Sequence, residues 1–179
     1  TCEFTDIYNK YPPGSNPNCP TCNSAGGVKY FSDLSMPTSG ATDAASMLMQ
    51  PVTLRLSDIQ SGVVRHPLRF TMANSRIQSG ISTNFQWPAL AGTSAASCSA
   101  PCWKYGMYAR LKSSVDISSF SATAQIILTG LKHYGMIMTD GGTDWGITSS
   151  TDLALDSNAR DALREIYKSS IRNTDFEVP

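Results

Sequence analysis

The segment 121–138, SATAQIILTGLKHYGMIM, decides the fold. From Ala124 to Tyr134 its apolar residues recur every three or four positions, which predicts an amphipathic helix with one buried face. A serine before this run, Ser119 or Ser121, suits the N-cap, and Gly135 suits the position after the last turn. The apolar triplet after the glycine predicts a short buried strand, so the segment is a helix that leads directly into a sheet.

Shorter elements are predicted on both sides of this unit. Leu68–Met72 and Tyr105–Leu111 alternate between apolar and polar residues and therefore predict strands. Ala159–Ser169 predicts a second long helix, capped by Asp156 and with its apolar side chains, Tyr167 among them, facing inward. The remaining expected elements are strands at Thr1–Tyr8, Val28–Phe31, Val52–Leu56, Trp145–Thr148 and Asp175–Val178, a helix at Ala44–Met49 and a turn at Asp58–Gly62.

Together these elements predict a single α+β domain over residues 1–179. The short strands favour a mostly antiparallel sheet or sandwich, with two to three helices packed against it and long loops stapled by disulfides. A hydrophobic fraction of 41% suffices for a sizeable core in a chain of 179 residues.

The charge pattern argues against two classes of partner. Basic and acidic residues number 14 each, so the formal net charge is zero, and no basic run marks a nucleic-acid interface. No polybasic or amphipathic segment marks a membrane surface. Only 16% of the residues are charged, a polar but uncharged balance that is typical of extracellular proteins. We therefore expect neither nucleic acid nor membrane among the partners.

The five cysteines indicate the compartment. Cys19 and Cys22 form one close pair and Cys98 and Cys102 another, which leaves Cys2 over. Two such pairs could hold zinc, and a CxxC could be redox-active, but prolines surround the first pair, so we predict disulfides and a secreted or cell-surface protein. The odd cysteine, Cys2, is expected to be free or to link the chain to an N-terminal fragment or a second chain.

Six segments in a fixed order carry a resemblance to a protein family. They are Arg65–Thr71, Trp87–Ala89, Tyr108–Lys112, Ala124–Ile137, Asp140–Trp145 and Asp175–Val178. This order resembles that of uncharacterised secreted proteins of soil bacteria and some fungi, over the range from Cys2 to the C-terminus. The resemblance implies that the chain is the C-terminal portion of a larger domain whose N-terminal segment is absent. The cysteine pair between Ser79 and Cys102 departs from the family pattern.

The candidate catalytic residues are His66, Asp140 and Asp144. His66 precedes a predicted strand and is either a general base or a hydrogen-bonded structural residue. Asp140 and Asp144 lie four residues apart in a glycine-rich loop. They could act as acid and base in glycoside hydrolysis, hold Ca²⁺, or simply form a turn. The spacing is not that of an EF-hand, and no other cofactor is expected.

The candidate ligand-binding residues are Trp87, Trp145, Arg69 and Arg110. Both tryptophans lie next to loops, where their rings could stack on sugars, although a core position is the alternative. Both arginines interrupt predicted strands, where they either face solvent or pair with Asp140 or Asp144 across the sheet.

Three functions fit these observations, and common catalytic motifs such as G-x-S-x-G or a P-loop are absent. The first is a hydrolase or lyase that acts on extracellular polysaccharide, the second a carbohydrate-binding module, and the third a structural subunit of a surface layer, filament or sheath. We place polysaccharide first. The hydrolase interpretation requires His66, Arg69, Asp140 and Asp144 to converge within about 8 Å.

Overall fold

The computed structural model describes residues 2–5, 28–31, 43–99, 101–171 and 173–178, the first two ranges as backbone only. The predictions for Cys19 and Cys22, and for the side chain of Cys2, lie outside this part of the chain. β1 (Cys2–Thr5) and β2 (Val28–Phe31) lie within the two strands predicted at Thr1–Tyr8 and Val28–Phe31, and they pair antiparallel in a two-stranded sheet that the sequence did not predict.

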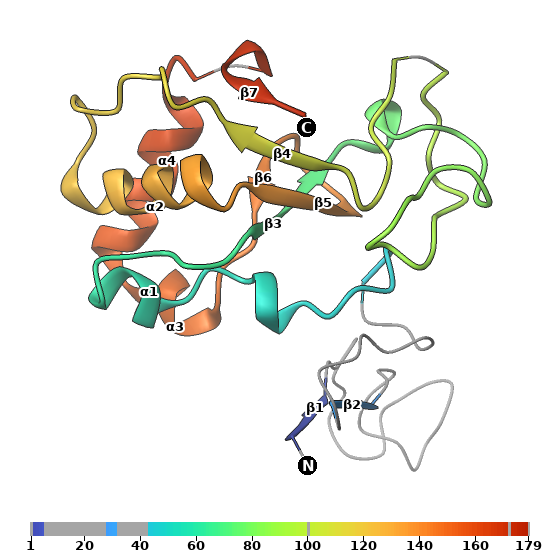
Figure 1. Cartoon of the computed structure of the whole chain (residues 1–179), viewed down its shortest axis with the longest axis horizontal. Coiled ribbons are helices and arrows are strands. Elements are labelled where there is room, and N and C mark those ends of the chain that lie inside the picture. The colour runs from blue at the N-terminus through green and yellow to red at the C-terminus, as the bar shows by residue number, and fades with distance from the viewer. Residues whose placement is uncertain (1, 6–27, 32–42, 100, 172, 179) are drawn as a thin grey trace.

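The main sheet has five strands in the order β6-β3-β5-β4-β7 (Figure 1). The central strand, β5, is parallel to its neighbour β3, and the other three pairings are antiparallel. The predicted α+β class is therefore confirmed, with a mixed sheet. The strands are β3 (Leu68–Met72), β4 (Tyr108–Leu111), β5 (Met136–Gly141), β6 (Gly146–Ile147) and β7 (Phe176–Glu177).

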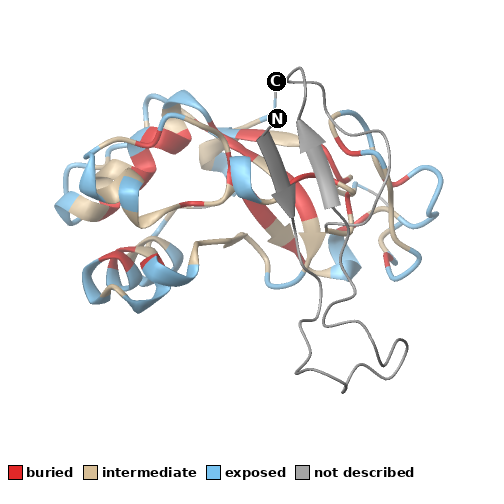
Figure 2. Ribbon diagram, turned by 90° about the horizontal axis from the view of Figure 1, so that it is seen from below, coloured by how far each residue is buried: buried red, intermediate tan, exposed pale blue. Residues whose placement is uncertain are grey.

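Four α-helices are present in the described ranges, where the sequence predicted two to three. They gather on one side of the molecule, and the long connection from β3 to β4 extends on the other side (Figures 1 and 2). None of the helices in this part of the chain is long and apolar enough to cross a membrane. The helices are α1 (Leu56–Gln60), α2 (Ala122–His133), α3 (Thr151–Leu155) and α4 (Ser157–Lys168).

The ends of the two long helices follow the sequence signals. The Ser121 hydroxyl accepts a hydrogen bond from the backbone N–H of Ala124, and the Asp156 carboxylate accepts one from Ala159. After α2 the chain reverses at Gly135, whose φ of 59° favours glycine. A Cβ at Gly135 would also lie only 2.5 Å from the Ala109 carbonyl oxygen, so this glycine is required both for the turn and for the contact with β4.

The segment 43–62 differs from its prediction. The expected helix at Ala44–Met49 is a turn followed by a short 3₁₀ helix at Gln50–Val52, and the expected strand at Val52–Leu56 forms no strand. The expected turn at Asp58–Gly62 is largely helix, because the Asp58 carboxylate accepts the backbone N–H of Arg55 and so caps α1.

The core lies between one face of the sheet and α2. Leu68, Phe70 and Met72 of β3 are buried on this face, and they lie beside Met136 and Met138 of β5. α2 contributes four of its five predicted apolar positions, which are buried: Ala124, Ile127, Leu128 and Leu131. The fifth, Tyr134, is the C-cap of the helix and is exposed, so the prediction of a buried face does not hold there. Burying a side chain of this size stabilises the fold by about 1.5–3 kcal/mol, so this layer is a major source of stability.

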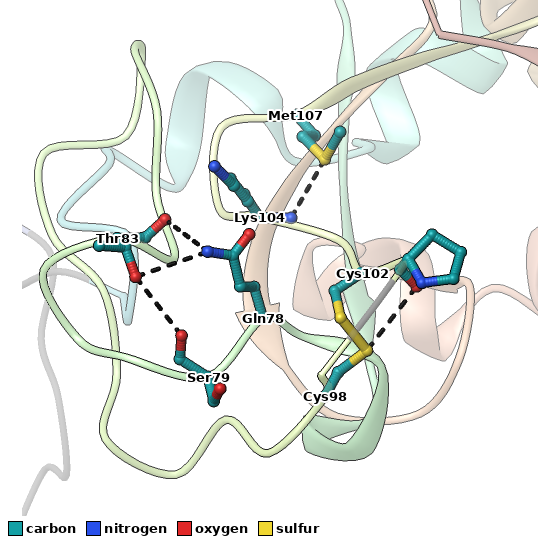
Figure 3. Close-up of a disulfide and its surroundings, with 8 residues drawn as sticks. Gln78, Ser79, Thr83, Cys98, Cys102, Lys104 and Met107 are labelled. Atoms are coloured by element: carbon teal, nitrogen blue, oxygen red, sulfur yellow. Dashed lines mark hydrogen bonds between the residues drawn. A yellow bond between two sulfur atoms is a disulfide. The ribbon is translucent and has the colours of Figure 1, made fainter.

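The connection from β3 to β4 contains the described disulfide, Cys98–Cys102 (Figure 3). Isolated β-bridges also hold both ends of the loop that this disulfide closes, because Cys98 pairs with Gln78 and Trp103, next to Cys102, pairs with Ile77. Cys98 and Cys102 are thus disulfide-bonded, as predicted, and they are bonded to each other, a connectivity that the sequence left open. The disulfide closes a loop with a sequence separation of only four residues, so the expected stapling of long loops is not shown by it.

Candidate functional site

Arg69 is the centre of a buried polar cluster on the face of the sheet opposite to the α2 core. β3 and β5 shift register between Phe70 and Thr71, so Thr139 is an extra residue, a β-bulge. Because side chains alternate between the faces of a strand, the extra residue turns Asp140 to the face of Arg69. The guanidinium donates to the Thr139 hydroxyl over 3.0 Å and to the Asp140 carboxylate over 3.5 Å.

Asp43 provides a second carboxylate for this cluster. Its Oδ2 accepts from Arg69 over 3.1 Å, and its Oδ1 accepts from two backbone N–H groups of the turn that follows. The carboxylate has no exposed surface, and burial raises the pKa of Asp43 to about 6, against the lowering effect of its hydrogen bonds and of Arg69. Burial and the charges of Asp140 and Asp43 raise the pKa of Tyr105 to about 12.

His66 belongs to a different contact group. Its Nε2 lies 3.1 Å from Oδ2 of Asp58, the residue that caps α1, and its Nδ1 lies 2.9 Å from the Pro67 carbonyl oxygen. Both ring nitrogens are engaged, and the ring ties α1 to the start of β3. These contacts match the structural alternative for His66.

Asp144 also has its own partners. Its Oδ2 accepts from Nε of Arg76 over 2.6 Å, and its Oδ1 accepts from the backbone N–H of Ala73 over 2.9 Å. These bonds fix the loop between β5 and β6. The next residue, Trp145, has a φ of 61°, which is unusual for a bulky side chain and is a kind of strain found most often at functional sites.

The sequence-predicted residues therefore divide into separate groups. Arg69 and Asp140 are in contact, whereas His66 pairs with Asp58. Arg110 pairs with Glu177, which lies opposite it on β7, and its Nε donates to Oε1 of Glu177 over 2.7 Å. The two carboxylates considered for Ca²⁺ each face a guanidinium. Within the described ranges no three acidic, histidine or cysteine side chains gather as a metal site would require.

A groove lies between α4 and the loop that carries Asp144. We call it the α4 groove. Its volume is about 590 Å³, within the usual range for ligand sites. Its walls are mainly apolar, and they come from the sheet face, from α4 and from the C-terminal strand. The apolar lining includes Met136, Trp145, Ile147, Leu163, Ile166 and Phe176.

Trp145 forms part of the wall of this groove. Phe70 and Phe176 both stack on its ring, with centroids 5.4 and 4.9 Å away and interplanar angles of 8° and 20°. Trp103 packs edge-on against the same cluster. Because two protein rings stack on Trp145, it shapes and stiffens the wall and leaves little ring face for a ligand.

Tyr167 is the accessible aromatic residue of the groove. The sequence predicted that it faces inward on α4, but its side chain is 64% exposed, so that prediction is wrong. The hydrophobic stripe of α4 is narrow, and Leu163 and Ile166 already occupy the side that packs against the hydrophobic core. A tyrosine at the rim of this stripe can present its ring to a ligand.

Three cations of α4 complete the groove, and sequence analysis missed them. Arg160, Arg164 and Lys168 are spaced four residues apart, so they lie along one side of the helix, and all three line the groove. The four-residue period was visible in the sequence. It could not be interpreted without knowing which helix face borders a cavity.

Trp87 lies away from this groove, in the connection from β3 to β4. It is 79% exposed and occupies a turn closed by a hydrogen bond from Ala89 N–H to the Gln86 carbonyl. Its ring is thus neither a core residue nor a part of the α4 groove.

Comparison with known proteins found no family model, no curated protein and no solved structure that matches the chain. The resemblance to secreted proteins of soil bacteria and fungi remains an expectation.

Proposed function

We propose that this is an extracellular domain that binds a polysaccharide in the α4 groove without cleaving it. The observation that carries this proposal is the combination of apolar walls, an exposed tyrosine and charged groups in one cavity of about 590 Å³. Sugars have apolar C–H faces that pack on aromatic rings and polar edges that need hydrogen bonds, so they suit a cavity of this mixed character. The Cys98–Cys102 disulfide supports an oxidising compartment.

Binding is favoured over hydrolysis by the partners of the candidate acids and bases. Hydrolysis needs two carboxyl groups on opposite sides of one glycosidic bond. The carboxylates of Asp140 and Asp144 contact Arg69 and Arg76 respectively, and both ring nitrogens of His66 have partners. Asp144 accordingly holds the loop that borders the α4 groove.

The test is polysaccharide affinity electrophoresis of the whole chain, with Tyr167→Ala as the site variant. We expect the wild-type protein to be retarded by at least one polysaccharide, and Tyr167→Ala to weaken that binding about tenfold through lost ring contact. Tyr134→Ala is the matched control, because Tyr134 is exposed and lies at the C-cap of α2, beside a different cavity. Equal binding by Tyr167→Ala and the wild type would reject the groove as the site.

A further inference from the structure

We infer that the polysaccharide bound in the α4 groove is acidic, and that Arg160, Arg164 and Lys168 bind its carboxylate groups. This inference rests on the proposed function and adds the chemical class of the ligand. Three cations line the groove, whereas only one carboxylate, that of Asp144, does so. The chain as a whole has a formal net charge of zero. The positive charge is therefore concentrated at the site.

The three cations are available to a ligand. Among the described residues Arg160 and Lys168 have no carboxylate partner, and Arg164 pairs only with the exposed Asp161 one turn away on the same helix. All three side chains are exposed. An exposed i,i+3 ion pair contributes little, so a ligand carboxylate can replace Asp161 at small cost.

The single lining carboxylate does not cancel this charge. Asp144 is already paired with Arg76, whose Nε lies 2.6 Å from its Oδ2. The spacing of the cations also favours a polymer over one small anion. Successive members are four residues apart, which is about 6 Å along a helix, so they present a row of positive charges. A chain with repeated carboxylates matches such a row.

A neighbouring cavity has a different charge balance. It shares Lys168 and Ile171 with the α4 groove, and its three carboxylates, those of Asp116, Glu165 and Asp175, outnumber its two cations, Lys112 and Lys168. The α4 groove, where three cations face one carboxylate, is therefore the more favourable of the two cavities for an acidic chain.

The experiment compares acidic polysaccharides with their neutral counterparts by affinity electrophoresis and calorimetry. The probes are polygalacturonate, alginate and hyaluronan, each beside its carboxyl-reduced form, which keeps a sugar chain and loses the charge. We expect at least one acidic form to bind at least about tenfold more tightly than its reduced form. We expect the triple variant R160Q/R164Q/K168Q to lose this preference.

Arg65→Gln is the matched control, because Arg65 is exposed, has no ion pair among the described residues and does not line the groove. Its binding should equal that of the wild type, and circular dichroism should show all variants folded. Equal binding of acidic and reduced forms, or unchanged binding by the triple variant, would overturn the inference and leave the proposed function standing. If no polysaccharide binds but laurate does, the groove takes a small amphipathic anion, and both proposals fail.

Discussion

At the scale of single residues, Asp43 and Arg69 illustrate what a buried ion pair contributes. Arg69 is almost fully buried and makes four side-chain hydrogen bonds, to Asp43, Thr139, Asp140 and Thr148. A guanidinium with this many partners is well compensated for the loss of water. Asp43 is less well compensated, because burial outweighs its favourable contacts and raises its pKa.

The raised pKa of Asp43 predicts how stability depends on pH. Its ordinary value is 3.8 and its value in the fold is about 6. A raised pKa means that this group's contribution to stability is fully present below about pH 4 and is lost as the pH rises through about 6. For this group we expect the free energy of unfolding to fall by about 2 kcal/mol between about pH 4 and pH 7.

The measurement is urea unfolding of the wild type and Asp43→Asn across this pH range. Asparagine stays neutral at every pH and can still accept the two backbone hydrogen bonds of the turn. The difference in unfolding free energy between the two proteins should therefore change with pH in favour of the variant above pH 6. Parallel pH profiles would show that Asp43 titrates normally in the folded protein.

A further prediction at the residue scale compares two tryptophans, one stacked in the fold and one exposed. Trp145→Ala removes the ring on which Phe70 and Phe176 stack, and we expect it to cost about 3 kcal/mol or more of unfolding free energy. Trp87→Ala removes a ring that is 79% exposed, and its cost should stay within about 0.5 kcal/mol. Denaturant midpoints measure both. A large cost at Trp87 would mean that its ring packs on other parts of the chain.

At the scale of elements, α4 and α2 are joined by a cap that no local pattern reveals. Glu165 of α4 accepts hydrogen bonds from the backbone N–H of Ser121 over 3.0 Å and from its hydroxyl over 2.6 Å. Ser121 in turn caps α2. The Glu165 carboxylate thus lies at the N-terminus of α2, where negative charge is favourable.

We predict that this cap couples the two helices. Glu165→Ala should cost about 1 kcal/mol, and a double-mutant cycle with Ser121→Ala should give a coupling energy of about 0.5–1.5 kcal/mol. Asp161→Ala is the control on the same helix, because its ion pair with Arg164 is exposed and should contribute less than about 0.5 kcal/mol. A coupling energy near zero would place the contribution of Glu165 elsewhere.

The same elements show how far sequence alone could go. The α2–β5 unit was predictable, because its apolar spacing, its serine cap and Gly135 all indicate the same boundaries. The register shift at Thr139 was not predictable, and it decides that Asp140 faces Arg69. The cap on α2 joins residues 44 positions apart, and such a contact follows from the packing of whole helices.

At the scale of the whole molecule, charge is balanced overall and uneven locally. The 14 basic and 14 acidic residues cancel, so the chain has no net charge to attract polyanions from a distance. The positive row on α4 acts at short range, over about 8–10 Å at physiological salt. Whatever affinity the protein has for an acidic polymer must therefore combine short-range ionic contacts with the apolar walls and the ring of Tyr167.

This combination predicts how binding responds to salt and to other polyanions. Raising NaCl from about 0.05 to about 0.5 M shortens the screening length from more than about 10 Å to less than about 5 Å. We expect the affinity for an acidic polysaccharide to fall with salt but to persist, because the apolar contacts are not screened. Duplex DNA, which buries its apolar ring faces in base stacks, should not compete. Calorimetric titration at several salt concentrations, with and without DNA, makes this measurement. Complete loss of binding at high salt, together with full competition by DNA, would contradict this prediction. It would mean that the α4 groove binds polyanions in general through charge alone.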